Sequence, residues 1–340
     1  MQKIVCCFGE ILLRFSPQLG GEWIKNATMP VFVGGAELNV ATALANWNVP
    51  VQYTSVLPDN QLSVELKQYI EEKGISADKM PCFGDRIGTY YLPQGADLKN
   101  AGVIYDRAHS AFWTLAPGKV DWDSILENVS WFHFSAISPA LNEDVVDACE
   151  EVLKIAKSKG ITVSVDLNYR AKLWKYGKHP VEIMPRLAKY CDVIMGNIWA
   201  ADWLLGIPVD ASINPDSTQE EYLAHSIRTA EAIQQQYPQC SVVAHTFRFD
   251  APPKGILYYT TLFTNGQQYV SPTFTIDEVV DKVGSGDCFM GGLIYGLYNE
   301  KSPQEVINYA AAAAFGKLNE YGDATKQSVY QVENLLARFL

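Results

Sequence analysis

Short apolar runs alternate with amphipathic stretches over most of this chain. Residues 4–8 form a continuous apolar run that ends at Gly9, which is typical of a strand buried on both faces of a parallel sheet. Further runs of this kind cover residues 51–57, 131–135, 161–167, 192–195 and 241–244. Helical periodicity lies between them, for example over residues 145–155. The alternation predicts a three-layer α/β/α domain with a mainly parallel sheet.

Two regions differ from this alternation of strands and helices. Tyr90-Tyr91-Leu92 and Val103-Ile104-Tyr105 are short β-type runs around a turn-rich segment, which predicts a hairpin outside the main sheet. We expect this hairpin to belong to a small β lid formed by about residues 11–33 and 86–113, within a single domain that spans residues 1–340. Residues 255–261 predict a strand at an antiparallel edge of the main sheet.

Two helices carry clear terminal signals. Asp59 is predicted to cap a helix that continues through Lys73 and stops at Gly74. Residues 302–305 read Ser-Pro-Gln-Glu, a capping box with proline at the first helical position, and they predict a helix through the alanine run at 310–314. We expect these alanines to allow close packing against a neighbouring helix rather than to contact a ligand.

Composition and charge narrow the possible partners. The chain has 340 residues, 48% of them hydrophobic, a formal net charge of -11 and no Lys/Arg run, which argues against nucleic acid and anionic membranes as partners. Neither a secretory signal nor an apolar run of about 18 residues is present. Seven cysteines without a CxxC pair predict reduced, buried thiols, so we expect a cytoplasmic protein.

The segment at 280–289 is the most informative for chemistry. It contains Gly284, Ser285, Gly286 and Asp287 directly before a small-residue helix. Two glycines around one small residue allow the backbone to approach an anion, and the following helix directs unpaired NH groups towards it. Asp287 would then be placed to take the proton of an attacking hydroxyl. The alternative is an ordinary turn with Asp287 as a helix cap.

A second segment, Gly-Gly-Ala-Glu-Leu-Asn-Val-Ala at 34–41, favours the chemical interpretation. Together the two segments resemble the two signatures of the ribokinase/PfkB carbohydrate kinases, in the usual order, and the resemblance covers nearly the whole chain. It implies a ribokinase-like fold and ATP with Mg²⁺ as cofactors. It also implies an anion hole at Gly284, Ser285 and Gly286, with Asp287 as the catalytic base.

Within that family the sequence is most similar to 2-keto-3-deoxygluconate kinases, through Gly9-Glu10, 34–39, 88–90, 105–107 and 166–170. The resemblance implies phosphorylation of this sugar acid at its terminal (6-) hydroxyl. An acid sugar needs a cation for its carboxylate, which Arg107 and Arg170 would supply. The implied substrate-binding residues are Gly34, Gly35, Asn39, Tyr90, Tyr105, Arg107, Asn168, Arg170 and Asp287.

Several of these residues also have a structural interpretation. Tyr90 and Tyr105 are equally compatible with packing of a hairpin, and the two arginines with a solvated surface. We expect Trp174, Trp199 and Trp203 to serve in packing, and Cys288 to be a small buried hydrophobe.

The nucleotide side departs from the family pattern. The family's Asn-x-x-Glu motif retains Asn197, implied in nucleotide binding, but has Ala200 in place of the glutamate, and Asp202 would face another side of the helix. A glycine turn that usually follows a late strand is replaced by residues 245–250. Two alternatives therefore stay open: another sugar kinase, such as a fructokinase or ribokinase, or a catalytically impaired protein that binds sugar acids. Metal-binding residues are not assigned, and we predict a homodimer that forms through the lid.

Overall fold

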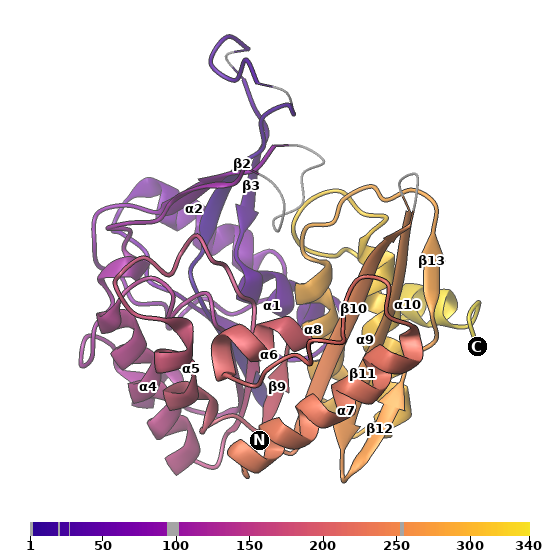
Figure 1. Ribbon diagram of the computed structural model, residues 1–340. Helices are drawn as coiled ribbons and strands as arrows, with labels where there is room; N and C mark the ends of the chain where they lie inside the picture. The colour runs from indigo at the N-terminus through magenta and orange to yellow at the C-terminus, as the bar shows by residue number, and fades with distance from the viewer. Residues whose placement is uncertain (1–2, 20, 27, 94–101, 252–254) are drawn as a thin grey trace.

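The computed structural model describes residues 3–19, 21–26, 28–93, 102–251 and 255–340. Within these ranges one large sheet runs through the molecule (Figure 1). Its strands are β1 (Ile4–Phe8), β4 (Val51–Thr54), β7 (Val129–Ser135), β8 (Thr162–Asp166), β9 (Val193–Met195), β10 (Val242–Ala251), β11 (Gly255–Thr264), β12 (Gln267–Val270) and β13 (Phe274–Ile276). The strand order is β12-β11-β10-β9-β8-β7-β1-β4, and β13 pairs with β11.

The strands from β4 to β10 in this order are all parallel, so the prediction of a mainly parallel sheet is confirmed. β11 is antiparallel to β10, β12 and β13 at one end of the sheet, so the prediction of a strand in an antiparallel edge is confirmed. β10 also continues well beyond the apolar run at 241–244. Its pairing with β11 extends to Ala251 opposite Gly255, which carries residues 245–250 along the sheet instead of into a turn.

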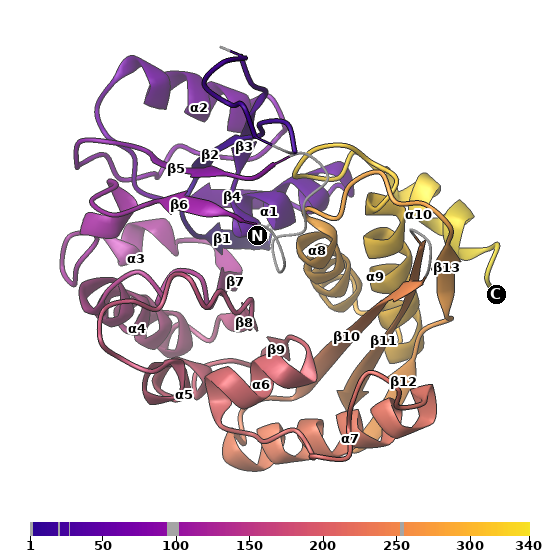
Figure 2. The same cartoon turned by 45° about the horizontal axis from the view of Figure 1, so that its top comes forward.

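Helices cover both faces of the sheet, which confirms the three-layer α/β/α architecture (Figure 2). One face packs against α1 (Ala36–Asn46), α2 (Gln61–Glu71), α8 (Ser285–Tyr298), α9 (Pro303–Lys317) and α10 (Val329–Leu336). The other packs against α3 (Trp122–Ile125), α4 (Glu143–Ser158), α5 (Pro180–Ala188), α6 (Ile198–Leu205) and α7 (Gln219–Gln236), with a 3₁₀ turn η1 at Phe112–Thr114. Each face therefore has its own hydrophobic core.

The helix caps of α2 and α9 lie at or next to the predicted residues. The cap of α2 is Asn60 rather than the predicted Asp59, because the Asn60 side chain accepts a hydrogen bond from the Ser63 amide at 3.0 Å. The capping box at the start of α9 is present. The alanine run of α9 is buried against α8, where a Cβ atom at Gly292 would lie 2.6 Å from the Ala310 Cα. The alanines therefore serve close helix packing, as predicted.

A second, smaller sheet stands at one end of the main sheet (Figure 1). Its order is β3-β2-β5-β6, with β2 (Leu12–Phe15), β3 (Val31–Gly34), β5 (Gly88–Tyr91) and β6 (Ile104–Asp106). β5 and β6 pair antiparallel, as the hairpin prediction required. We call these four strands the lid sheet. Apart from Gly34 at the end of β3, they lie in the ranges 11–33 and 86–113 predicted to form the lid, of which residues 94–101 and positions 20 and 27 lie outside the described residues.

All seven cysteines are free thiols, and six of them are buried, with Cys82 exposed. Over the described residues, no helix combines the length and apolar character needed to cross a membrane.

Candidate active site

Two cavities meet where the carboxyl ends of the parallel strands face the lid sheet and the N-terminus of α8. The first lies under the lid sheet, and we call it the lid-side cavity. The second, of about 560 Å³, lies over β8–β10 and the start of α8, and we call it the outer cavity. Both are lined by Tyr105, Asn168, Arg170 and Asp287. Asp287 therefore stands at their junction, in the position at an open α/β sheet where ligands usually bind.

The lid-side cavity gathers most of the residues predicted to bind the substrate. They come from β3–α1, the lid sheet, the loop after β8 and α8: Gly35, Asn39, Tyr90, Tyr105, Arg107, Asn168, Arg170 and Asp287. Gly34 stands behind this wall, where an added Cβ would lie 3.2 Å from the Tyr90 hydroxyl. Gly35 has φ +142° and an added Cβ there would lie 2.7 Å from the Glu10 carbonyl oxygen, so the turn into α1 requires glycine.

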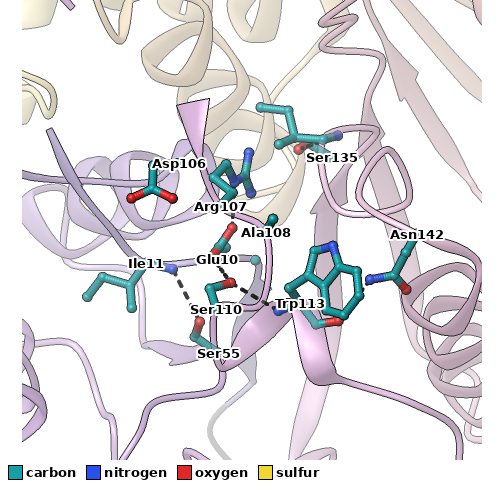
Figure 3. Close-up of polar contacts among 12 residues, drawn as sticks. Glu10, Ile11, Ser55, Asp106, Arg107, Ala108, Ser110, Trp113, Ser135 and Asn142 are labelled. Atoms are coloured by element: carbon teal, nitrogen blue, oxygen red, sulfur yellow. Dashed lines mark hydrogen bonds and ion pairs between the residues drawn. The ribbon is translucent and has the colours of Figure 1, made fainter. Parts of the chain in front are cut away.

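Arg107 is held by a carboxylate that sequence reasoning did not place in the site (Figure 3). The Arg107 Nε donates to Glu10 Oε2 at 2.5 Å, and the Ser110 hydroxyl donates to Glu10 Oε1 at 2.5 Å. All three side chains are buried. Because Glu10 occupies only Nε, the terminal guanidinium nitrogens are what Arg107 can offer to a ligand. The signal in the sequence was the Gly9-Glu10 dipeptide at the end of the first strand.

Asp287 lies in the first turn of α8 and is hydrogen-bonded to the other signature segment. The Asn39 side-chain amide donates to Asp287 Oδ2 at 2.7 Å. The amide oxygen of Asn39 is buried and has no hydrogen-bond partner among the described residues. Burial raises the pKa of the Asp287 carboxyl to about 6, while the Asn39 hydrogen bond and the nearby Arg170 guanidinium oppose the rise. The carboxylate is thus ready to accept a proton near neutral pH.

A second buried carboxyl, Glu37, lines the same cavity. Its Oε1 has no partner among the described residues, and burial raises its pKa to about 7. The carboxyl lies directly on Gly9, where an added Cβ would come 2.0 Å from Glu37 Oε2. Gly9 thus leaves room for this acid. In the sequence, Glu37 stands out only as part of the 34–41 segment.

Asp323, in the loop after α9, was missed entirely. Its Oδ2 accepts a hydrogen bond from Arg14 Nε at 2.8 Å and forms an ion pair with Arg14 Nη2 at 2.7 Å, and its Oδ1 accepts a hydrogen bond from the Tyr90 hydroxyl at 3.1 Å. Its carbonyl oxygen packs on Gly284, since a Cβ there would lie only 1.8 Å away. Asp323 therefore joins the lid sheet to the glycine loop that precedes α8. No local pattern marked it, because its partners come from β2, β5 and the loop before α8.

The outer cavity contains the residues predicted to bind the nucleotide: Asn197, Gly284, Ser285 and Gly286. A Cβ added at Gly286 would meet nothing within 4 Å, so the backbone there borders open space. Arg248 from β10 also lines this cavity, and its Nη1 lies 3.5 Å from the Ser285 hydroxyl. An exposed backbone at a helix N-terminus with a nearby guanidinium suits a polyphosphate.

The tryptophans divide between packing and the cavity. Trp199 and Trp203 pack against aromatic neighbours, as expected, and both line the outer cavity as well. Trp199 also packs edge-on against Tyr222, and Trp203 packs against Tyr169 while half exposed. Trp174 stacks on Tyr176, in keeping with a packing role. Cys288 is buried, as expected.

The metal ligands of this site are sparse. No group of three or more His, Cys, Asp or Glu side chains able to hold a metal ion occurs in the described part of the chain. Ala200, at the position of the family's glutamate, lines the outer cavity. The residues present therefore fit a Mg²⁺ ion held mainly by nucleotide phosphates and water, which is a common way for proteins to bind this ion.

The fold, the two signature segments and the cavity at their meeting point define a class of protein. The sequence model of the pfkB family carbohydrate kinases matches residues 2–328, and the chain belongs to this family. The sequence-based assignment to these kinases is confirmed.

Three relatives indicate which members the chain is similar to. It is 29% identical to the 2-dehydro-3-deoxygalactonokinase of Haloferax volcanii, over 97% of this chain and 95% of the relative. It is 25% identical to the 2-dehydro-3-deoxygluconokinase of Bacillus subtilis, over 93% and 90% of the two chains. The crystal structure of a 2-dehydro-3-deoxygluconokinase from Thermotoga maritima superimposes with a TM-score of 0.88 at 34% identity, covering 99% and 100%.

Proposed function

We propose that this kinase phosphorylates 2-keto-3-deoxygluconate at its 6-hydroxyl, with ATP as the phosphoryl donor. The observation that carries the proposal is the position of Asp287 between two cavities, one lined by two arginines and one bordered by the glycine loop. A sugar acid in the lid-side cavity and a nucleotide in the outer cavity would meet at this carboxylate. The names of the relatives described above support the same class of substrate.

The charges of the lid-side cavity favour an acid over a neutral sugar. Arg107 presents its terminal nitrogens from beside the lid sheet, and Arg170 comes from the loop after β8. In a six-carbon 2-keto acid the carboxylate and the terminal hydroxyl lie at opposite ends of the molecule. A carboxylate held by the arginines would therefore direct O6 towards Asp287. Asn39, whose amide oxygen is unpartnered, would accept a hydrogen bond from a hydroxyl next to the base.

The transfer itself follows from these positions. O6 attacks the γ-phosphorus, the bond between that phosphorus and the β,γ-bridging oxygen breaks, and ADP leaves with its electron pair. Asp287 takes the hydroxyl proton. The backbone NH groups around Gly284, Ser285 and Gly286 stabilise charge on the transferred group. Mg²⁺ bound to the phosphates would supply further charge neutralisation, and Asn197 in the outer cavity would contact the nucleotide.

The proposal includes a homodimer in which two lid sheets pack together. Val31 on the edge strand β3 and Ile104 on the edge strand β6 are each about half exposed. Apolar side chains on open sheet edges are favourable sites for pairing with a second copy.

An assay of ADP release from Mg-ATP tests the function. We would compare kcat/KM for 2-keto-3-deoxygluconate, 2-keto-3-deoxygalactonate, gluconate, fructose and ribose. The proposal expects the highest value for 2-keto-3-deoxygluconate. A preference for fructose or ribose would make the protein a different sugar kinase of the same family.

A second candidate function rests on Ala200. Because this residue replaces an acid that helps to organise magnesium in the family, a sugar-acid-binding protein without turnover is the alternative of a different class. Calorimetric binding of 2-keto-3-deoxygluconate without ADP release on any sugar of the panel would favour it.

A further inference from the structure

One buried cation near the site has no role in the account above. Lys317 is the last residue of α9, and its side chain is fully buried. Its ammonium group donates to the Glu320 carbonyl oxygen at 3.0 Å. Taking an ammonium group out of water is costly unless it is paired, so a lysine at such a position needs compensating negative groups.

Those groups belong to two loops that meet around the lysine. Burial lowers the pKa of Lys317, and the neighbouring Asp281, Glu320 and Asp323 oppose the change. The Asp281 carboxylate also accepts hydrogen bonds from the amides of Val283 at 3.0 Å and Gly322 at 3.2 Å. The ammonium therefore lies where the loop at 281–286 and the loop at 317–323 are hydrogen-bonded to each other.

The lysine lies directly behind the glycine loop. A Cβ added at Gly284 would lie 3.5 Å from Lys317 Cε, on the side of the loop that also faces the Asp323 carbonyl. Gly286, two residues along, borders the open space of the outer cavity. The ammonium charge of Lys317 is thus placed behind the short segment whose NH groups border the outer cavity. Because Lys317 is buried, water does not screen this charge.

We propose that Lys317 is a positioning residue for phosphoryl transfer: a fixed internal cation that joins these two loops and adds positive potential beneath the anion hole. This inference rests on the proposed role of the glycine loop and Asp287, but it is independent of which sugar is phosphorylated. A preorganised charge of this kind stabilises the transition state without reorganisation during the reaction.

The same charge acts on the proposed base. The charged groups around Asp287 are Arg170 from the loop after β8, Lys317 from α9, Asp323 from the loop after α9 and Glu37 from α1. Arg170 and Lys317 lower the Asp287 pKa, whereas Asp323 raises it. Removing Lys317 should therefore move the acid limb of the kcat/KM profile to higher pH, which loss of packing alone would not do.

The test uses the full-length enzyme and the sugar on which it is most active. Lys317→Ala removes the charge and leaves space for a small amine, Lys317→Met removes the charge and keeps an apolar stem, and the exposed Lys326→Ala is the matched control. We expect both Lys317 variants to lose roughly 10²-fold in kcat, the size of effect seen for one preorganised electrostatic group. KM for the sugar should change much less. Lys326→Ala should behave as wild type.

Rescue by a free cation separates the charge from the packing. Ethylammonium chloride should restore kcat of Lys317→Ala by about tenfold or more, while the bulkier tetramethylammonium chloride at the same ionic strength should not. Lys317→Met, whose side chain fills the space, should not respond. Circular dichroism and the thermal midpoint report whether each variant is folded.

Three results would overturn the inference. The first is a kcat near that of the wild type in both Lys317 variants. The second is a folded Lys317→Ala whose kcat no small amine restores. The third is loss of the folded state in both variants even with ethylammonium, because Lys317 would then be a stability residue only. Failure of the proposed site itself would look different, because Asp287→Asn would then keep its activity.

Discussion

The two cavities that meet at Asp287 are built in different ways. The lid-side cavity is narrow, about 60 Å³, and its polar groups are fixed in advance by buried contacts such as those of Glu10 with Arg107 and Asp323 with Arg14. The outer cavity is about nine times larger, at about 560 Å³, with tryptophans on its wall and an alanine where the family has an acid. One cavity is preorganised for a small charged ligand, whereas the other offers space and a helix N-terminus.

The two cavities should therefore differ in how strongly a side-chain substitution affects activity. In the lid-side cavity, buried ion pairs fix the direction of each hydrogen-bond donor. Even a small side-chain substitution there should therefore have a large effect on kcat/KM. A wide cavity that contacts a polyphosphate mainly through backbone groups should tolerate side-chain changes.

The largest effect on kcat is expected at Asp287, where the two cavities meet. Asp287→Asn keeps the size of the side chain but removes the proton acceptor, so kcat should fall by roughly 10² to 10⁴ while sugar binding stays largely intact. Single-turnover kinetics and calorimetric sugar binding measure the two quantities. Asp202→Asn on α6 is a matched control, because Asp202 lines neither cavity. Wild-type kcat in Asp287→Asn would exclude it as the base.

On the lid side, Arg107→Met and Arg170→Met each remove a charge-assisted bond worth about 1.5 to 3 kcal/mol, which should raise KM for the keto acid around ten- to hundredfold. Neutral sugars should lose much less. Steady-state kinetics on both kinds of sugar would show the difference, with the exposed Arg338→Met as control. Equal losses on acidic and neutral sugars would mean that neither arginine recognises the carboxylate.

The pH dependence of kcat/KM should report the ionisation of Asp287, where the two cavities meet. Since the pKa of Asp287 is raised to about 6 and its ionised form is the proposed base, kcat/KM should be maximal above that pH and fall as the pH drops through it. Asn39→Ala removes the hydrogen bond that lowers this pKa, so its acid limb should lie at higher pH. An unchanged limb in Asn39→Ala would assign it to another group.

A smaller effect is expected in the outer cavity. Ala200→Glu restores an acid at the start of α6, within a cavity that has room for it. It should lower the Mg²⁺ concentration needed for half-maximal activity by a few-fold, roughly the effect of one added carboxylate near a hydrated ion. Magnesium titration of the kinase assay, with Asp202→Glu as control, measures this. Loss of activity in Ala200→Glu would show that the outer cavity is as restrictive as the lid side.

The smallest effect on catalytic activity is expected from a change of oligomeric state. Light scattering at micromolar concentration should give a dimer for the wild type, and Ile104→Lys on the edge strand β6 should shift it towards monomer. A wild-type monomer would remove the lid-dimer proposal without touching the predictions for Asp287.

The sequence predicted the parts of the site that lie in one continuous segment. The glycine loop with Asp287, and Gly35 with Asn39, each sit at a strand or turn that leads into a helix, so local pattern was enough to find them. Glu10 and Asp323 could not be assigned in this way. Their partners are about 100 and 300 residues away in the chain, and only the fold brings them together. Similarly, no pattern in α9 distinguished its last lysine from an exposed one.

Identifying the product tests directly whether the 6-hydroxyl of the keto acid is the phosphoryl acceptor. Phosphorus and proton NMR of the reaction with 2-keto-3-deoxygluconate and Mg-ATP would locate the new phosphate ester. We predict one product, in which the phosphorus couples to the protons on the terminal carbon, because a carboxylate bound by the arginines would leave the terminal hydroxyl facing Asp287. Phosphate on any other oxygen, or no product from this sugar while a neutral sugar reacts, would contradict it.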